Sequence, residues 1–149
     1  MKTILVTGGC GFIGSHTLVD LIQNGYNVIS IDNNSRSSEN LLAGVYKITG
    51  VEVKNHKIDL CDYAAVRQVF EGNKIDGIIH FAAYKAVDES VKDPLLYYRN
   101  NFESLVNLLD CTREFAIPYF VFSSSCSVYG DIEKMPVTED TVLSEPKSP

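Results

Sequence analysis

The sequence predicts an α/β protein built on a doubly wound parallel sheet, and three observations support this fold class. Short apolar runs alternate with longer segments in which apolar residues recur at helical spacing. The first run leads into a glycine-rich turn, Thr7 to Gly14, and a helical pattern follows directly. No internal repeat interrupts the alternation. Strands and helices in this order form a parallel sheet through right-handed crossovers, with helices on both faces.

Three strands and two helices are expected at the beginning of the chain. The continuous apolar run Ile4-Leu5-Val6 predicts a buried strand, because a half-exposed strand would alternate. Asn24-Gly25 and Gly50 end the helical patterns that precede them. The elements are a strand at 2–7, a helix at 12–22, a strand at 27–32, a helix at 38–49 and a strand at 51–56.

The later elements include two helices with clear start signals. Asp62 is placed to cap the first of them, and Asp93-Pro94 combines a capping acid with a proline at the first helical position. These elements are a helix at 64–70, a strand at 77–81, a helix at 93–116 and a strand at 119–123. The predicted strand order is 3-2-1-4-5, which reverses between the first and fourth strands, where ligands bind.

Composition argues against several classes of protein. The chain has 149 residues, a net charge of -6 and no basic cluster, so no nucleic-acid partner is expected. No apolar run reaches the roughly 18 residues of a membrane helix. Met1-Lys2-Thr3 shows no signal-peptide pattern, so a cytoplasmic protein is expected. The cysteines form no C-x-x-C pair, so neither a metal site nor a disulfide framework is expected; they are Cys10, Cys61, Cys111 and Cys126.

The segment from Thr7 to Gly14 has the features of a phosphate-binding turn. A strand, a glycine turn and a helix N-terminus leave backbone N–H groups and the positive end of the helix dipole facing an anion. Two spacings overlap in it, Gly9-x-Gly11-x-x-Gly14 and the longer Gly8-x-x-Gly11-x-x-Gly14. Both predict a Rossmann-type socket for the pyrophosphate of a dinucleotide.

Asp32 closes the second strand about 20 residues after the glycine turn, where a ribose-binding acid is expected. A carboxylate there can accept hydrogen bonds from both adenosine ribose hydroxyls and would repel a 2′-phosphate. NAD is therefore expected rather than NADP, although the nearby Arg36 would soften that preference. A plain turn residue remains the alternative for Asp32. Asp59, after the third strand, would either reach the adenine amine or simply cap the next turn.

Hydroxyl side chains follow the last predicted strand, in the run from Ser123 to Gly130. Side chains at the carboxyl end of a central parallel strand lie in the ligand crevice. Ordinary turns also use serine, and that interpretation is kept for Ser124.

Several segments together resemble the UDP-glucose 4-epimerases of the extended short-chain dehydrogenase/reductase group. The glycine loop is shared by the whole group, whereas Lys85-Ala86-Val87 and the serines before Val128-Tyr129-Gly130 are more specific to the epimerases. The likeness covers the whole chain. It is carried by Thr7–Gly14, Asp32-Asn33, His80-Phe81-Ala82-Ala83, Lys85-Ala86-Val87, Glu89-Ser90-Val91, Tyr97–Asn101 and Ser123–Gly130.

The resemblance implies an NAD site, part of a UDP-sugar site and no metal. It implies pyrophosphate contacts from Gly8, Gly11, Phe12, Ile13 and Gly14, ribose contacts from Asp32 and Asn33, and adenine contacts from Asp59 and Leu60. It places Phe81, Ala82, Ala83 and Lys85 along the nicotinamide half, with Asn100 and Ser123 completing the cofactor site. The implied substrate residues are Lys85, Ser125, Cys126 and Ser127. Ser125 would be catalytic, through a hydrogen bond to the sugar 4-hydroxyl, whereas an exposed loop lysine is the alternative for Lys85.

In the resembling family a tyrosine of a Tyr-x-x-x-Lys motif takes the hydroxyl proton, and no such motif occurs in these 149 residues. Residues 1–130 are therefore expected to form an incomplete NAD-binding Rossmann domain. Residues 131–149 would be a loop leading to the absent catalytic helix, and the remaining strands and substrate domain would also be missing. A tyrosine needs a cationic neighbour to act as a base near neutral pH, so this chain is expected to be inactive.

The complete enzyme is expected to be a homodimer that interconverts UDP-galactose and UDP-glucose by oxidation and re-reduction at C4. Two alternatives stay open, a non-catalytic NAD-binding module and another sugar-nucleotide epimerase of the extended group. A 4,6-dehydratase is disfavoured, because that family carries an Asp-Glu pair where this chain has Cys126-Ser127.

Overall fold

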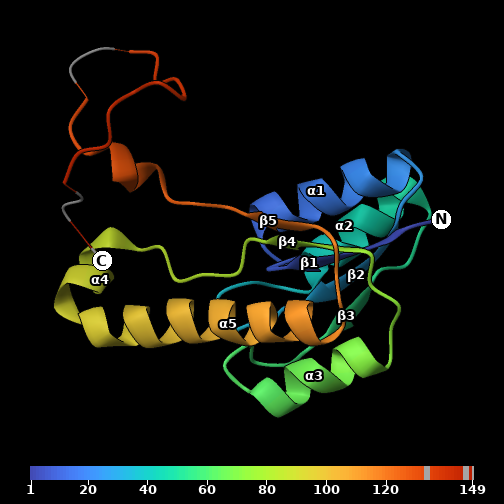
Figure 1. Ribbon diagram of the computed structural model, residues 1–149. Helices are drawn as coiled ribbons and strands as arrows, with labels where there is room; N and C mark the ends of the chain where they lie inside the picture. Colours follow the sequence, from blue (N-terminus) through green and yellow to red (C-terminus); the bar gives the residue numbers. More distant parts are fainter. Residues whose placement is uncertain (133–134, 146–147, 149) are drawn as a thin grey trace.

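The computed structural model describes residues 1–132, 135–145 and 148, and within them five strands form one sheet. All neighbouring strands are parallel and their order is β3-β2-β1-β4-β5, which confirms the predicted topology. The strands are β1 (Thr3–Thr7), β2 (Asn27–Ile31), β3 (Lys54–His56), β4 (Gly77–His80) and β5 (Phe120–Phe122). The helices are α1 (Phe12–Gln23), α2 (Asn40–Thr49), α3 (Tyr63–Glu71), α4 (Val87–Lys92) and α5 (Pro94–Glu114), and a 3-10 helix, η1 (Cys126–Tyr129), follows β5 (Figure 1).

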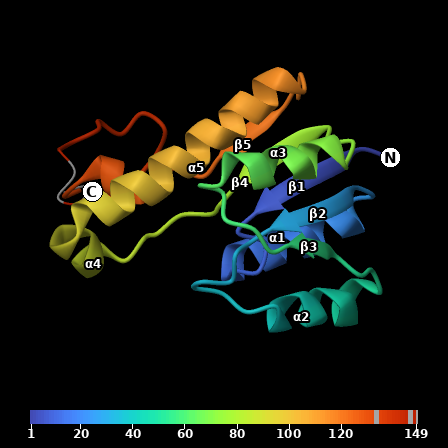
Figure 2. The same cartoon turned by 90° about the horizontal axis from the view of Figure 1, so that it is seen from below.

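The sheet lies between two helical layers, α1 with α2 on one face and α3 with α5 on the other (Figure 2). Successive β1 residues supply the two cores, because neighbouring strand side chains point to opposite faces. Leu5 packs in the core beneath α3 and α5 with Val66 and Leu108, whereas Val6 packs with Leu18 on the α1 side. The first buried strand was correctly predicted from this unbroken apolar run.

The capping predictions at Asp62 and Asp93 are confirmed. Ala65 N–H donates to the Asp62 carboxylate at 3.1 Å, and Leu96 N–H donates to Asp93 at the same distance. The long helix accordingly begins at Pro94. Each acid accepts a hydrogen bond from an N–H that has no partner inside its helix.

Besides η1, which was not predicted, two elements differ from the sequence prediction. The third strand was expected at 51–56 but pairs with β2 only over Lys54–His56. Helix α4 was not predicted, because six residues are too few to establish a helical period. Of the predicted loop at 131–149, residues 133–134, 146–147 and 149 lie outside the described residues, and the rest of it contains no helix or strand.

Candidate functional site

At Gly8 and Gly14 in the turn between β1 and α1, backbone atoms leave no space for a side chain. Gly8 has a φ of +72°, and a β-carbon added there would lie 3.0 Å from the backbone nitrogen of Ala82. A β-carbon on Gly14 would collide with the carbonyl group of Gly8. Gly11 N–H donates to that same carbonyl at 3.0 Å, which closes the turn. The turn therefore lies against the β4 segment, at the place where the strand order reverses.

The start of α1 is open to an anion. Among the described residues no side chain caps this helix at Gly11, and its first turn contains no acidic residue. Phe12 and Ile13 are 73% and 49% exposed. The first N–H groups of a helix have no partner within it and lie at the positive end of its dipole. This arrangement suits the pyrophosphate contacts that the sequence assigned to the turn.

The Asp32 carboxylate lies beside the glycine turn, although the two are far apart in sequence. One oxygen accepts a hydrogen bond from Cys10 N–H at 3.0 Å, and the other accepts from Asn34 N–H at 3.0 Å and the Ser37 hydroxyl at 2.7 Å. The bond to Asn34 is that of an Asx turn, so Asp32 does shape its loop. A carboxylate has about four acceptor sites, which leaves capacity for a ribose hydroxyl.

Asn33 and Asp59 lie together on the β3 side of Asp32. The Asn33 amide donates to Asp59 at 3.4 Å, and Asp59 also accepts from Cys61 N–H at 2.9 Å, so it caps that turn. Leu60 is 6% exposed and its side chain packs in the core. The Leu60 side chain is therefore not available for the adenine contact that the resemblance implies, which leaves only its backbone.

The segment after β4 carries the residues assigned to the nicotinamide half. Phe81 N–H donates to the Thr7 carbonyl at 3.2 Å, while Ala83 and Lys85 are exposed. The assigned Asn100 donates at 2.9 Å to Asn101, its neighbour on α5. Asn101 itself anchors this segment, because it accepts from Tyr84 N–H at 2.8 Å and donates to the Tyr84 carbonyl at 2.9 Å.

The serine run lies beyond the end of β5. Ser123 N–H donates to the His80 carbonyl at 3.1 Å and so extends the strand pairing by one residue. Ser125 caps η1 by accepting from Ser127 N–H at 3.2 Å. Ser125 and Cys126 are exposed, and η1 is set apart from the strand ends (Figure 1). The structure thus brings together the residues assigned to the adenosine side, whereas Ser125, Cys126 and Ser127, which were assigned to the substrate, lie on the separate η1 segment.

A buried imidazole lies beneath the site, and sequence reasoning did not assign it a role. His80 Nδ1 and the Thr7 hydroxyl share a hydrogen bond of 2.6 Å, and Ala82 N–H donates to the same hydroxyl at 3.3 Å. The His80 ring is 3% exposed and packs near Phe120 and Phe122. Burial lowers the pKa of His80 to about 4, so its ring is neutral at pH 7.

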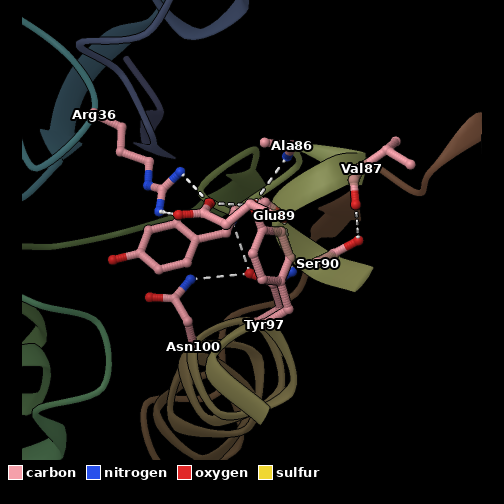
Figure 3. A network of polar contacts seen from close by, with 9 residues as sticks. Arg36, Ala86, Val87, Glu89, Ser90, Tyr97 and Asn100 are labelled. Atoms are coloured by element: carbon pink, nitrogen blue, oxygen red, sulfur yellow. Dashed lines mark hydrogen bonds and ion pairs between the residues drawn. The ribbon is translucent and has the colours of Figure 1, made fainter. Parts of the chain in front are cut away.

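A polar network links the loop after β2 with α4 and α5 (Figure 3). The Arg36 guanidinium donates to both Glu89 oxygens, at 2.6 and 2.9 Å, and lies 4.0 Å over the Tyr84 ring. The Tyr97 hydroxyl donates to Glu89 at 2.5 Å and accepts from Ala86 N–H at 3.2 Å. Arg36 and Glu89 are 53 positions apart, and no local pattern in the sequence pairs them.

A parallel sheet with an open glycine turn after β1 and an acid after β2 is the arrangement of the Rossmann class of dinucleotide-binding folds. A family model described as GDP-mannose 4,6 dehydratase matches residues 5–149. The chain belongs to that family.

Its relatives include UDP-glucose 4-epimerases. The enzyme of Neisseria meningitidis serogroup A is 46% identical over 149 residues, which cover 100% of this chain and 44% of the relative. The Bacillus subtilis enzyme is 47% identical over 140 residues, which cover 94% of this chain and 41% of the relative. The resemblance to these epimerases is confirmed. The chain spans less than half the length of these relatives.

Solved structures agree with these relatives. The Bifidobacterium longum UDP-glucose 4-epimerase in complex with NAD+ and UDP has a TM-score of 0.91 and 45% identity, covering 96% of this chain and 43% of that one. The Thermus thermophilus enzyme in complex with NAD has a TM-score of 0.86 and 32% identity, covering 99% of this chain and 45% of that one. The family description names a dehydratase and these proteins are epimerases, so membership alone does not select a reaction.

In the part of the chain that the structure describes, no three His, Cys, Asp or Glu side chains gather as a metal site. No helix of that part is long and apolar enough to cross a membrane. A cavity of about 500 Å³ lies at the opposite edge of the sheet, lined by Thr3, Asn27 and Val28 among others, and it includes none of the assigned site residues.

Proposed function

We propose that this chain forms the NAD-binding part of an epimerase that interconverts UDP-galactose and UDP-glucose. The observation that carries the proposal is the Asp32 carboxylate held by Cys10 N–H, next to the open start of α1. A protein 45% identical to this chain has been solved with NAD+ and UDP. The cytoplasm is the proposed location, in keeping with four cysteines that are free thiols in the structure.

The residues fit the cofactor. Gly8 and Gly14 let the turn fold tightly against Ala82 and the start of α1, and the exposed N–H groups at Phe12 and Ile13 would bind the pyrophosphate. Asp32 would accept hydrogen bonds from the adenosine ribose. The other assigned residues would contact the remaining parts of the cofactor: Gly11, Asn33, Asp59 and Leu60 on the adenosine side, and Phe81, Ala82, Ala83, Lys85, Asn100 and Ser123 on the nicotinamide side.

The reaction would need no outside redox partner. The glycine turn and Asp32 would hold NAD, which would supply the hydride acceptor and donor for C4 of the sugar. The Ser125 hydroxyl would hold the sugar 4-hydroxyl during the proton transfer, and Cys126 and Ser127 would border the sugar. Lys85, which is exposed, would contact both cofactor and substrate.

The proton acceptor is not among these residues, because the sequence contains no Tyr-x-x-x-Lys. We therefore expect the 149-residue chain alone to bind NAD and to leave UDP-galactose unchanged. A non-catalytic NAD-binding module is the second candidate, and the same missing motif favours it. A 4,6-dehydratase is less consistent with Cys126-Ser127 at the start of η1. Another epimerase of the extended group would differ in the sugar that it accepts.

The exposed face of α5 supports a homodimer in the complete enzyme. Large apolar side chains recur on it at helical spacing, and they are Leu95, Tyr98, Phe102, Val106 and Leu109. Such a face on a helix normally packs against another protein surface. Sedimentation of the complete enzyme should give a dimer, and Phe102→Glu should shift it towards monomer. A dimer unaffected by that change would place the interface elsewhere.

Titration of the chain with NAD, followed by incubation with UDP-galactose and NAD, tests the proposed function. Saturable NAD binding without formation of UDP-glucose is expected. A chain that binds no NAD would contradict the cofactor site. Formation of UDP-glucose by these residues alone would contradict the need for a Tyr-x-x-x-Lys tyrosine.

A further inference from the structure

Arg36 occupies a position where a cation would weaken the preference for NAD. It lies four residues after Asp32 in the same loop. A guanidinium stays charged and forms paired hydrogen bonds with phosphate oxygens. In dinucleotide-binding folds an arginine near the ribose acid accommodates the 2′-phosphate of NADP. A free Arg36 would therefore compete with Asp32 in choosing the cofactor.

The Arg36 side chain is directed elsewhere. The hydrogen bonds to Asp32 come from Cys10, Asn34 and Ser37, whereas the guanidinium is held by both oxygens of Glu89 (Figure 3). Its flat face also covers the Tyr84 ring at 4.0 Å. Arg36 thus links the loop after β2 to the segments that follow β4.

Glu89 is itself held in place by α5. Tyr97, which is 2% exposed, donates its hydroxyl to Glu89 at 2.5 Å. Burial and the neighbouring carboxylate raise the pKa of Tyr97, so this hydroxyl remains a donor. The hydrogen bond from Arg36, with a smaller effect from Tyr97, lowers the pKa of Glu89 to about 2, so the carboxylate is charged at neutral pH.

We propose that Glu89 is a positioning residue for cofactor specificity: it binds the Arg36 guanidinium and keeps this cation away from the ribose 2′ position. The Asp32 carboxylate then decides between a 2′-hydroxyl and a 2′-phosphate. The inference rests on the proposed NAD site, and it assigns a discriminating role to a residue of α4 that need not touch the cofactor.

The test is a pair of titrations, NAD and NADP, on the 149-residue chain and its variants. Glu89→Gln keeps the shape of the side chain and an oxygen that accepts the Tyr97 hydrogen bond, but it removes the negative charge that holds Arg36. It should lower the ratio of the NADP to the NAD dissociation constant about tenfold, since that is the order of one charge-assisted hydrogen bond. The change should come mainly from tighter NADP binding.

Three variants separate this role from a structural one. The double change Glu89→Gln with Arg36→Gln should restore the original ratio, because the released cation is gone. Arg36→Gln alone should leave the ratio as it is, because Arg36 is already held. Asp88→Asn, the neighbouring acid on α4, is the matched charge control and should also have no effect.

Each outcome decides the inference. An unchanged ratio in a folded Glu89→Gln protein would overturn it, and so would a double variant that keeps the gain in NADP affinity. If circular dichroism shows that Glu89→Gln does not fold, Arg36→Lys replaces it. An ammonium cannot make the paired contact with Glu89, so the ratio should again fall, and an unchanged ratio would contradict the proposal. A parent chain that binds neither nucleotide would instead contradict the NAD site.

Discussion

Burial of His80 makes the stability of this fold depend on pH between about 4 and 6.5. The imidazole is 3% exposed, and burial lowers its pKa from 6.5 to about 4. In the unfolded chain the ring titrates at its ordinary value, so as pH falls below 6.5 the unfolded state binds the proton first. Acidification therefore favours unfolding, and the loss is complete once the pH is below the folded-state pKa.

The magnitude follows from the two pKa values. A shift from 6.5 to about 4 corresponds to about 3 kcal/mol in total, at about 1.4 kcal/mol for each pH unit. At pH 5 the unfolded state is almost fully protonated at this site while the folded state is almost fully neutral, which gives a loss of about 2 kcal/mol. That is a large share of the roughly 5–15 kcal/mol that stabilises a typical domain.

Urea unfolding at pH 7.5 and at pH 5.0, followed by circular dichroism, measures this loss. The comparison is with His80→Gln, which keeps a neutral hydrogen-bonding group near Thr7. Burial also lowers the pKa of His56, so part of the acid sensitivity will remain in the variant. The parent protein should lose about 2 kcal/mol more than the variant between the two pH values.

An equal loss in the parent and the variant would refute the reasoning. An NMR titration gives an independent check, because the His80 ring resonances should stay those of a neutral imidazole down to pH 5. A midpoint above pH 6 would show that the ring is charged more easily than its buried place between Thr7 and Phe122 implies.

Three further predictions concern the site residues. Asp32→Asn should weaken NAD binding about tenfold and NADP binding less, because a charged acceptor for the ribose is lost. Parallel titrations with NAD and NADP measure both effects. A parent chain that binds NAD and NADP with equal affinity would contradict the role of Asp32 in choosing the cofactor. Gly14→Ala should destabilise the chain by about 1–3 kcal/mol in thermal unfolding, because the added methyl group meets the Gly8 carbonyl. The control Gly44→Ala, on open helix surface, should instead increase the free energy of unfolding by about 0.5–1 kcal/mol. A Gly14→Ala chain as stable as the parent would show that the turn can widen. In the complete enzyme Ser125→Ala should lower turnover about 100-fold while NAD affinity stays constant, and unchanged turnover would refute its catalytic role.

The fold was predictable because its signals are local. The apolar run of β1, the glycine turn and the capping acids at 62 and 93 each act within a few residues, and together they fix the order of the elements. Helix α4 was missed for the same reason, since six residues carry no usable period. The third strand was predicted too long because Val51 and Val53 are apolar but lie before the paired residues.

Contacts between residues far apart in the chain could not be predicted from the sequence. Thr7 and His80 are 73 positions apart, and Arg36 and Glu89 are 53 apart. Each residue alone looks ordinary: a threonine at the end of a strand, or an arginine in a polar loop. Their roles arise only when parallel strands bring the ends of β1, β2 and β4 to one edge.

The two asparagines of α5, Asn100 and Asn101, show most clearly what the sequence alone could not predict. Asn100 was assigned to the cofactor site from the family resemblance, yet Asn101 forms both hydrogen bonds to the Tyr84 backbone. Adjacent helical residues point about 100° apart, so helix phase decides which one reaches the segment after β4. Asn100 then donates to Asn101 and stays half-buried beside it. The position of the Tyr84 segment, which was assigned to the nicotinamide half, therefore depends on how α5 is rotated against the sheet, and core packing at Leu108 and Cys111 sets that rotation.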